Sequence, residues 1–114
     1  MSIIWGAVNR PKHGQSISGD TFVVEEYGEN KMLVSVIDGL GGGQEASTAA
    51  ESAAAILRKN PEYPLEQLIR QSHNALRSTR GAVIAILRLD GTIRRADFIG
   101  VGNIGIQVYS PQQI

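Results

Sequence analysis

The chain has 114 residues, a length that fits one ordinary domain and is too short for two enzymatic ones. Eleven basic side chains balance eleven acidic ones, so no net positive charge is available to attract nucleic acid or anionic lipid. The sequence contains no cysteine, which excludes disulfides, thiolate metal sites and cysteine nucleophiles.

No targeting or membrane segment is visible in the sequence. The first residues lack the basic and apolar regions of a signal peptide. The longest apolar run, 82–87, is far below the ~18 residues that a membrane-spanning helix needs. We therefore expect a cytoplasmic protein that binds neither membrane nor nucleic acid.

The first part of the chain predicts strands. Residues 3–8 predict a short strand, and 9–19 predict a loop because they carry proline, glycine and serine. Segments 20–27 and 31–37 are rich in β-branched and aromatic side chains. They are separated only by Gly28-Glu29-Asn30, which predicts a β-hairpin.

Two helices are predicted in the middle of the chain. Small apolar residues recur at spacings of three and four from Ala46 to Leu57, which predicts a helix with one buried face. Two prolines then end this helix, and we expect Pro64 to be the first residue of a second one. The predicted buried stripe of the second helix consists of Leu65, Leu68, Ile69, Ser72 and Leu76.

The last part of the chain returns to strands. Segments 82–89 and 92–101 predict a hairpin closed by the two residues Asp90-Gly91, and 104–109 predicts a final strand. Strands on both sides of a helix pair favour an α+β fold. We expect a mostly antiparallel sheet with the helix pair packed on one face.

The chain has four aspartates, and their surroundings differ. Asp90 is explained by its turn, and Asp97 is typical of a solvated or ion-paired strand position. Asp20 begins one strand of the first predicted hairpin and Asp38 follows the other, so strand pairing brings both carboxylates to one end of the sheet. Neighbouring carboxylates repel each other and are usually stabilised by a cation or a shared proton.

Simpler roles for this pair stay open. Asp38 could cap the helix that follows it, and Asp20 could close a loop. The glycines at 39 and 41–43 favour a ligand site instead, because they let the backbone approach a ligand and lead into a helix N-terminus that attracts anions.

Other glycine-rich sites match poorly. A P-loop is excluded because no Lys followed by Ser or Thr ends the glycine run. A dinucleotide-binding pattern is met weakly by Gly41, Gly43 and Ala46, but a second helix is predicted where that fold needs a parallel strand. His13 and His73 have no neighbours at metal-ligand spacing.

Several segments together resemble the PPM-type metal-dependent serine/threonine phosphatases, and most of all their small bacterial RsbX- and SpoIIE-like branch. They occur in the order of the family and cover nearly the whole chain. The segments are Ser-Gly-Asp-Thr-Phe at 18–22, Val-Ile-Asp-Gly-Leu-Gly at 36–41, Thr-Arg-Gly-Ala-Val at 79–83 and Gly-Val-Gly-Asn-Ile at 100–104.

The resemblance implies an α-β-β-α sandwich with two Mg²⁺ or Mn²⁺ ions held between its two antiparallel sheets. Carried over by position, Asp38 would bridge both metals, the backbone carbonyl of Gly39 would bind one, and Asp20 would bind a metal or orient a metal-bound water. Asp20 and Asp38 would then be catalytic residues in phosphoserine and phosphothreonine hydrolysis by a metal-activated water.

The sequence departs from the family pattern in two places. Asn103 stands where many members have aspartate. The family also takes metal-binding aspartates from a later Thr-Asp-Gly segment and from a late Asp-Asp or Asp-Asn element, and neither occurs before Ile114. The resemblance therefore implies that residues 1–114 form a single PPM-phosphatase-like domain, truncated at its C-terminal side and with an incomplete metal site.

Two classes of function follow. The first is a protein serine/threonine phosphatase that acts on phosphorylated regulators of a bacterial stress or sigma-factor partner-switching pathway, such as an anti-sigma-factor antagonist or a stressosome-like protein. The second is a non-catalytic phosphatase-like module or inactive fragment that binds a partner, or itself, through the face left uncovered by the missing C-terminal elements.

Overall fold

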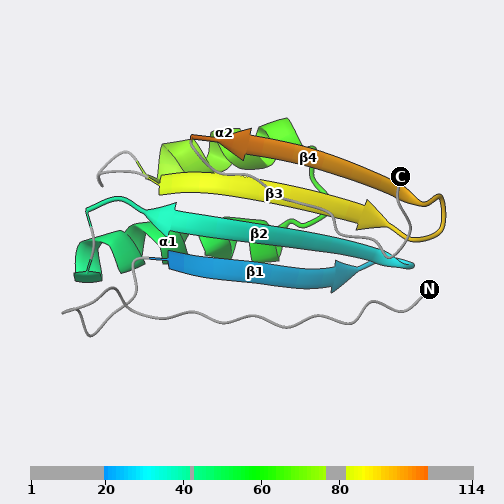
Figure 1. The fold of residues 1–114 in the computed structure, drawn as a ribbon, viewed down its shortest axis with the longest axis horizontal. Coiled ribbons are helices and arrows are strands. Elements are labelled where there is room, and N and C mark those ends of the chain that lie inside the picture. Colours follow the sequence, from blue (N-terminus) through cyan, green and yellow to red (C-terminus); the bar gives the residue numbers. More distant parts are fainter. Residues whose placement is uncertain (1–19, 42, 77–81, 103–114) are drawn as a thin grey trace, which may run out of the picture.

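A computed structural model describes residues 20–41, 43–76 and 82–102. Four strands form one antiparallel sheet in the order β1-β2-β3-β4, and both helices lie against the same face of it (Figure 1). In chain order the elements are β1 (Asp20–Tyr27), β2 (Lys31–Gly39), α1 (Gly43–Lys59), α2 (Leu65–Ala75), β3 (Ala82–Asp90) and β4 (Arg95–Val101).

The predicted α+β fold is confirmed, with a helix pair on an antiparallel sheet. The strands expected at 3–8 and 104–109, and the loop expected at 9–19, lie outside the described residues. Neither of the two helices in the described segments is long and apolar enough to cross a membrane.

The hairpin of β1 and β2 is confirmed. Tyr27 pairs with Lys31 across a loop of three residues, 28–30. Gly28 and Asn30 have φ angles of 55° and 57°, a left-handed conformation that these two residue types adopt more readily than others. The loop therefore sets the register in which the two strands pair.

The predicted two-residue turn between β3 and β4 is wrong. Asp90 is the last residue of β3 and pairs with Arg95, so residues 91–94 form the loop. The Asp90 carboxylate accepts hydrogen bonds from the backbone N–H groups of Thr92 at 3.0 Å and Ile93 at 3.4 Å. These bonds stabilise the wider turn, because an aspartate that bonds the backbone two residues ahead mimics a turn of its own.

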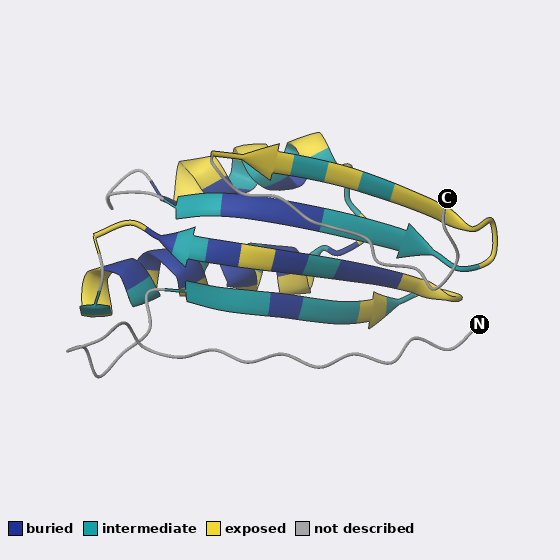
Figure 2. Ribbon diagram, in the orientation of Figure 1, coloured by how far each residue is buried: buried dark blue, intermediate teal, exposed yellow. Residues whose placement is uncertain are grey.

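The first helix buries the face that its spacing predicts. Since alanine has a small side chain, α1 can approach the sheet closely, and its inward residues form a core with apolar side chains of β1, β2 and β3 (Figure 2). The buried residues of α1 are Ala46, Ala49, Ala50, Ala53, Ala54 and Leu57.

The second helix starts one residue later than predicted. Pro64 precedes the helix with φ −53° and ψ 139°, which is extended backbone, and α2 begins at Leu65. The reason is that the residue just before a helix keeps non-helical angles while its carbonyl accepts the first helical hydrogen bond. Of the predicted stripe, Leu68 and Ser72 are buried in α2 and Leu76 just after it.

An arginine of the sheet fixes the connection between the helices. Nη2 of Arg88, in β3, donates to the carbonyl oxygen of Pro61 at 2.7 Å and also to that of Tyr63. Hydrogen bonds from a charged donor are stronger than neutral ones. The helix pair is therefore attached to the sheet through this connection as well as through its apolar face.

Two buried serines provide a test of this packing. Ser35 donates its hydroxyl to the carbonyl of Ala85 at 2.8 Å, whereas the Ser72 hydroxyl has no hydrogen-bond partner in the part of the chain that the structure describes. We expect Ser35→Ala to lower the free energy of unfolding by about 1 kcal/mol. Ser72→Ala should raise it by about 1 kcal/mol, because it removes an unpaired buried hydroxyl and favours helix.

Urea denaturation of both variants measures these effects. Because the substitution is the same and both sites are fully buried, each variant is the control for the other. Changes of the same sign would contradict the assigned hydrogen bonding.

Candidate functional site

The sheet has two faces of different character. Side chains alternate along a strand, and Val23, Leu33 and Ile37 point into the core under the helices. Asp20 and Asp38 stand an odd number of positions from Val23 and Ile37, so they point away from the helices, to what we call the outer face.

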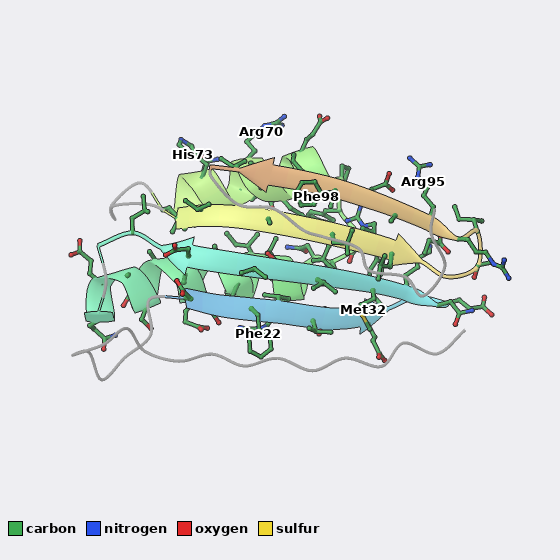
Figure 3. The ribbon with its side chains drawn as sticks, viewed as in Figure 1. Phe22, Met32, Arg70, His73, Arg95 and Phe98 are labelled. Carbon is green, nitrogen blue, oxygen red and sulfur yellow. The ribbon has the colours of Figure 1, made fainter. Side chains whose placement is uncertain are left out.

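Apolar residues share the outer face with the two aspartates. By the same alternation and by strand pairing, it carries Phe22, Val24, Val34, Val36, Leu87, Leu89 and Phe98. In Figure 3 this face is turned toward the viewer, with Phe98 in front of the sheet and the helices behind it. The exposed fraction is 46% for Val36 and 49% for Phe98.

The register brings the two aspartates together, as the sequence predicts. Asp20 pairs directly with Asp38 across β1 and β2, and both residues are half-buried. Residues directly opposite each other in an antiparallel pair have Cβ atoms about 4.5–5.5 Å apart. Two carboxylates on one face at that spacing can bind a single cation between them.

The alternative role of Asp38 as a helix cap is wrong. Asp38 lies inside β2, and α1 begins only at Gly43. Gly41 and Gly43 have φ angles of 103° and 64°, so glycines make the turn into the helix without help from the Asp38 carboxylate. Gly39, the last residue of β2, is buried next to Asp38.

The same end of the sheet gathers a second glycine segment. Val83, near the start of β3, pairs with Asp38 on its other side. Gly102, just after β4, lies against Val83, since a Cβ built on Gly102 would be 2.8 Å from Val83 Cγ1. Sequence reasoning did not predict that Val83 lies beside Asp38. Only the strand register places this ordinary apolar residue there.

The other candidate residues lie elsewhere. Asp97 forms an exposed ion pair with Arg95, Nε to Oδ2 at 3.0 Å, as expected from the sequence. Asp90 belongs to the turn at the opposite end of the sheet, and His73 is exposed on α2. His13 lies outside the described residues.

The donor chemistry of the aspartate pair fits a hard divalent cation. Carboxylate oxygens are the ligands that Mg²⁺ and Mn²⁺ prefer. Mg²⁺ is commonly bound through one or two carboxylates while it keeps several waters. Within residues 20–41, 43–76 and 82–102 no group of three or more His, Cys, Asp or Glu side chains could hold a metal ion, so Asp20 and Asp38 supply only part of a ligand set.

Comparison with known proteins places the fold. No protein-family model matches the chain. It is 28% identical over 100 residues to the phosphoserine phosphatase RsbX of Bacillus subtilis, a match that covers 88% of this chain and 50% of RsbX. The chain is thus similar in sequence to a phosphoserine phosphatase. It spans about half the length of the curated relative that it matches.

Two solved structures are also similar to this chain in fold. The crystal structure of RsbX in complex with magnesium superposes with a TM-score of 0.78 and 27% identity over 84% of this chain and 48% of RsbX. A second solved structure comes from work on the bacterial stressosome, described as a modular system adapted to control secondary messenger signalling. It superposes with a TM-score of 0.80 and 34% identity, over 84% of this chain and 50% of the chain in that structure.

The topology of the described segments differs from the dinucleotide-binding fold. The dinucleotide-binding fold needs a parallel strand after its first helix. Here α1 is followed by α2, and all pairs of neighbouring strands in the described segments are antiparallel.

Cation binding at the aspartate pair can be measured as a thermal shift. We expect Mn²⁺ at ten times its Kd to stabilise the protein by about 1.4 kcal/mol, because a ligand that binds only the folded state adds its binding free energy. Asp38→Asn should abolish this stabilisation. Without metal, the same variant should melt at a higher temperature than the parent protein, because the repulsion between two carboxylates is removed.

Asp97→Asn is the matched control, because it removes one carboxylate from an exposed ion pair elsewhere on the sheet. If Mn²⁺ shifted the melting temperature of Asp38→Asn as much as that of Asp97→Asn, the ion would be bound somewhere other than the aspartate pair.

Proposed function

We propose that this protein is a metal-dependent phosphoserine and phosphothreonine phosphatase of the PPM type, with its active site at the Asp20–Asp38 end of the outer face. The observation that carries the proposal is the direct pairing of Asp20 with Asp38, in a chain related to a phosphoserine phosphatase. Residues 1–114 belong to a single phosphatase-like domain, and further metal ligands come from residues outside those that the structure describes.

In this proposal each residue has a distinct role. Asp38 would hold two Mg²⁺ or Mn²⁺ ions, the carbonyl of Gly39 would be a ligand to one of them, and Asp20 would bind a metal or orient a water. Bound cations supply Lewis acidity and lower the pKa of a coordinated water toward neutrality. The chain itself contributes rigid placement, since β2 is paired with a strand on each side.

The surroundings of the pair support the proposal. Phe22 and Val36 form the next pair along the same face, so apolar groups border the carboxylates on the side of the sheet centre. Charges interact more strongly where apolar groups exclude water. The pair therefore has a setting in which a cation is bound more firmly than by two fully solvated carboxylates.

The substrates follow from the relatives. RsbX is a phosphoserine phosphatase, and a neighbour of similar fold comes from work on the bacterial stressosome. We propose that the substrate here is a phosphorylated regulator of a bacterial stress or sigma-factor partner-switching pathway, such as an anti-sigma-factor antagonist or a stressosome-like protein.

The proposed activity is tested with a phosphoserine peptide and Mn²⁺. We expect phosphate release that depends on the metal and that falls by at least about 100-fold in Asp38→Asn, since a bridging ligand is lost. Asp97→Asn should retain full activity. Phosphate release that persists in Asp38→Asn, or that needs no metal, would contradict the proposed site.

The exposed apolar side chains of the outer face favour a second candidate function. Val36 and Phe98 are about half exposed on this face, and clustered exposed apolar residues commonly mark an interaction surface. The protein would then be a non-catalytic phosphatase-like module that binds a partner, or a second copy of itself, through the outer face.

Light scattering and calorimetry distinguish this second candidate. It predicts association that Phe98→Ser weakens by at least about tenfold, as for an exposed aromatic anchor of an interface. It also predicts no heat on titration with Mn²⁺. A monomer that binds Mn²⁺ tightly would count against this candidate, because neither the self-association nor the lack of Mn²⁺ binding that it predicts would be seen.

A further inference from the structure

Four residues form a row across the outer face at the aspartate end of the sheet. Asp20 of β1 pairs with Asp38 of β2, and Asp38 pairs with Val83 of β3. Gly102 completes the row just beyond β4, where it contacts Val83. Three strands and the residue after β4 thus contribute one position each, and Val83 separates the glycine from the carboxylate pair.

The contact between Gly102 and Val83 leaves no room for a side chain. A Cβ on Gly102 would lie 2.8 and 2.9 Å from the two methyl carbons of Val83 and 3.3 Å from its Cβ. Carbon atoms pack best at about 3.5–4.0 Å, so these distances are clashes. Valine is stiff at χ1 and cannot fold away as a long flexible side chain could.

We propose that Val83 is a positioning residue for Asp38, and that Gly102 provides the space that keeps Val83 in place. Because Asp38 is the neighbour of Val83 on the side away from Gly102, a side chain at 102 would displace Val83 toward the Asp38 carboxylate. Displacement would change the geometry in which the pair holds a cation. The predicted effect on cation binding rests on the proposed function. The steric contact between Gly102 and Val83 is independent of it.

A purely conformational role for Gly102 makes a different prediction. Gly102 has φ +94°, so any substitution strains its backbone. The double variant of Gly102→Ala and Val83→Ala keeps this backbone strain but lacks the methyl groups that cause the clash. Backbone strain alone therefore predicts no recovery in the double variant, whereas the clash predicts recovery.

The test compares Gly102→Ala, Val83→Ala and the double variant by NMR. The first readout is the carboxyl ¹³C signal of Asp38 without metal, and the second is the Kd for Mn²⁺ from paramagnetic broadening of the Asp38 amide signal. We expect Gly102→Ala to shift the carboxyl signal and to weaken Mn²⁺ binding about tenfold, as for residues that orient a metal ligand. The double variant should reverse most of this shift and recover most of the affinity.

Each outcome decides a separate question. The positioning role would be overturned if the Asp38 carboxyl signal did not move in Gly102→Ala. It would also be overturned if the double variant did not regain the Mn²⁺ affinity that Gly102→Ala loses. If the signal moves and returns as expected but Mn²⁺ broadens no Asp38 signal in the parent protein, the positioning role stands and the proposed function fails. Should Gly102→Ala not fold, the double variant still tests the contact, because loss of the two Val83 methyl groups removes the clash and should restore both folding and the Asp38 carboxyl signal.

Discussion

The pairing of β1 with β2 is the constraint on which the candidate site depends. Its register is set by the three-residue loop at 28–30 and places Asp20 opposite Asp38. A slip by one residue would turn one strand over, because side chains alternate between faces. One carboxylate would then enter the alanine-lined core, and no pair would exist. The loop residues with positive φ therefore determine, through the register, which residues lie opposite each other at the other end of the hairpin.

The two faces of the sheet differ in what they carry: the inner face packs against the helices, and the outer face holds the candidate site. On the inner face, the small side chains of α1 allow close packing over Val23, Leu33 and Ile37, and this burial supplies the main stabilisation of the described segments. The outer face carries apolar residues at its centre and the carboxylates at one end. A repulsive pair of charges is tolerated there because the core that holds the strands together lies on the opposite side.

Local patterns in the sequence predict the strands, the helices and the meeting of Asp20 with Asp38, because each depends on near neighbours or on one short loop. The row that includes Val83 and Gly102 was not predictable in this way. A two-residue turn at Asp90-Gly91 would pair Leu89 with Thr92 and so place Phe98, not Gly102, beside Val83. The hydrogen bonds of the Asp90 carboxylate stabilise a wider turn, which shifts the register. This register depends on side-chain hydrogen bonds in the loop and cannot be predicted from the periodicity of the strands.

The two aspartates differ in how firmly the fold holds them. Asp38 lies in a strand paired on both sides, between Asp20 and Val83. Among the described segments, the strand that begins at Asp20 pairs only with β2, and Arg58 ties it to α1 through a hydrogen bond from Nη2 to the carbonyl of Phe22 at 3.3 Å. A side chain that must hold a cation in one position needs a rigid backbone, whereas a side chain at a strand end can adjust its position to the cation. Under the proposed function, the two-sided pairing of β2 favours Asp38 as the ligand shared by two cations.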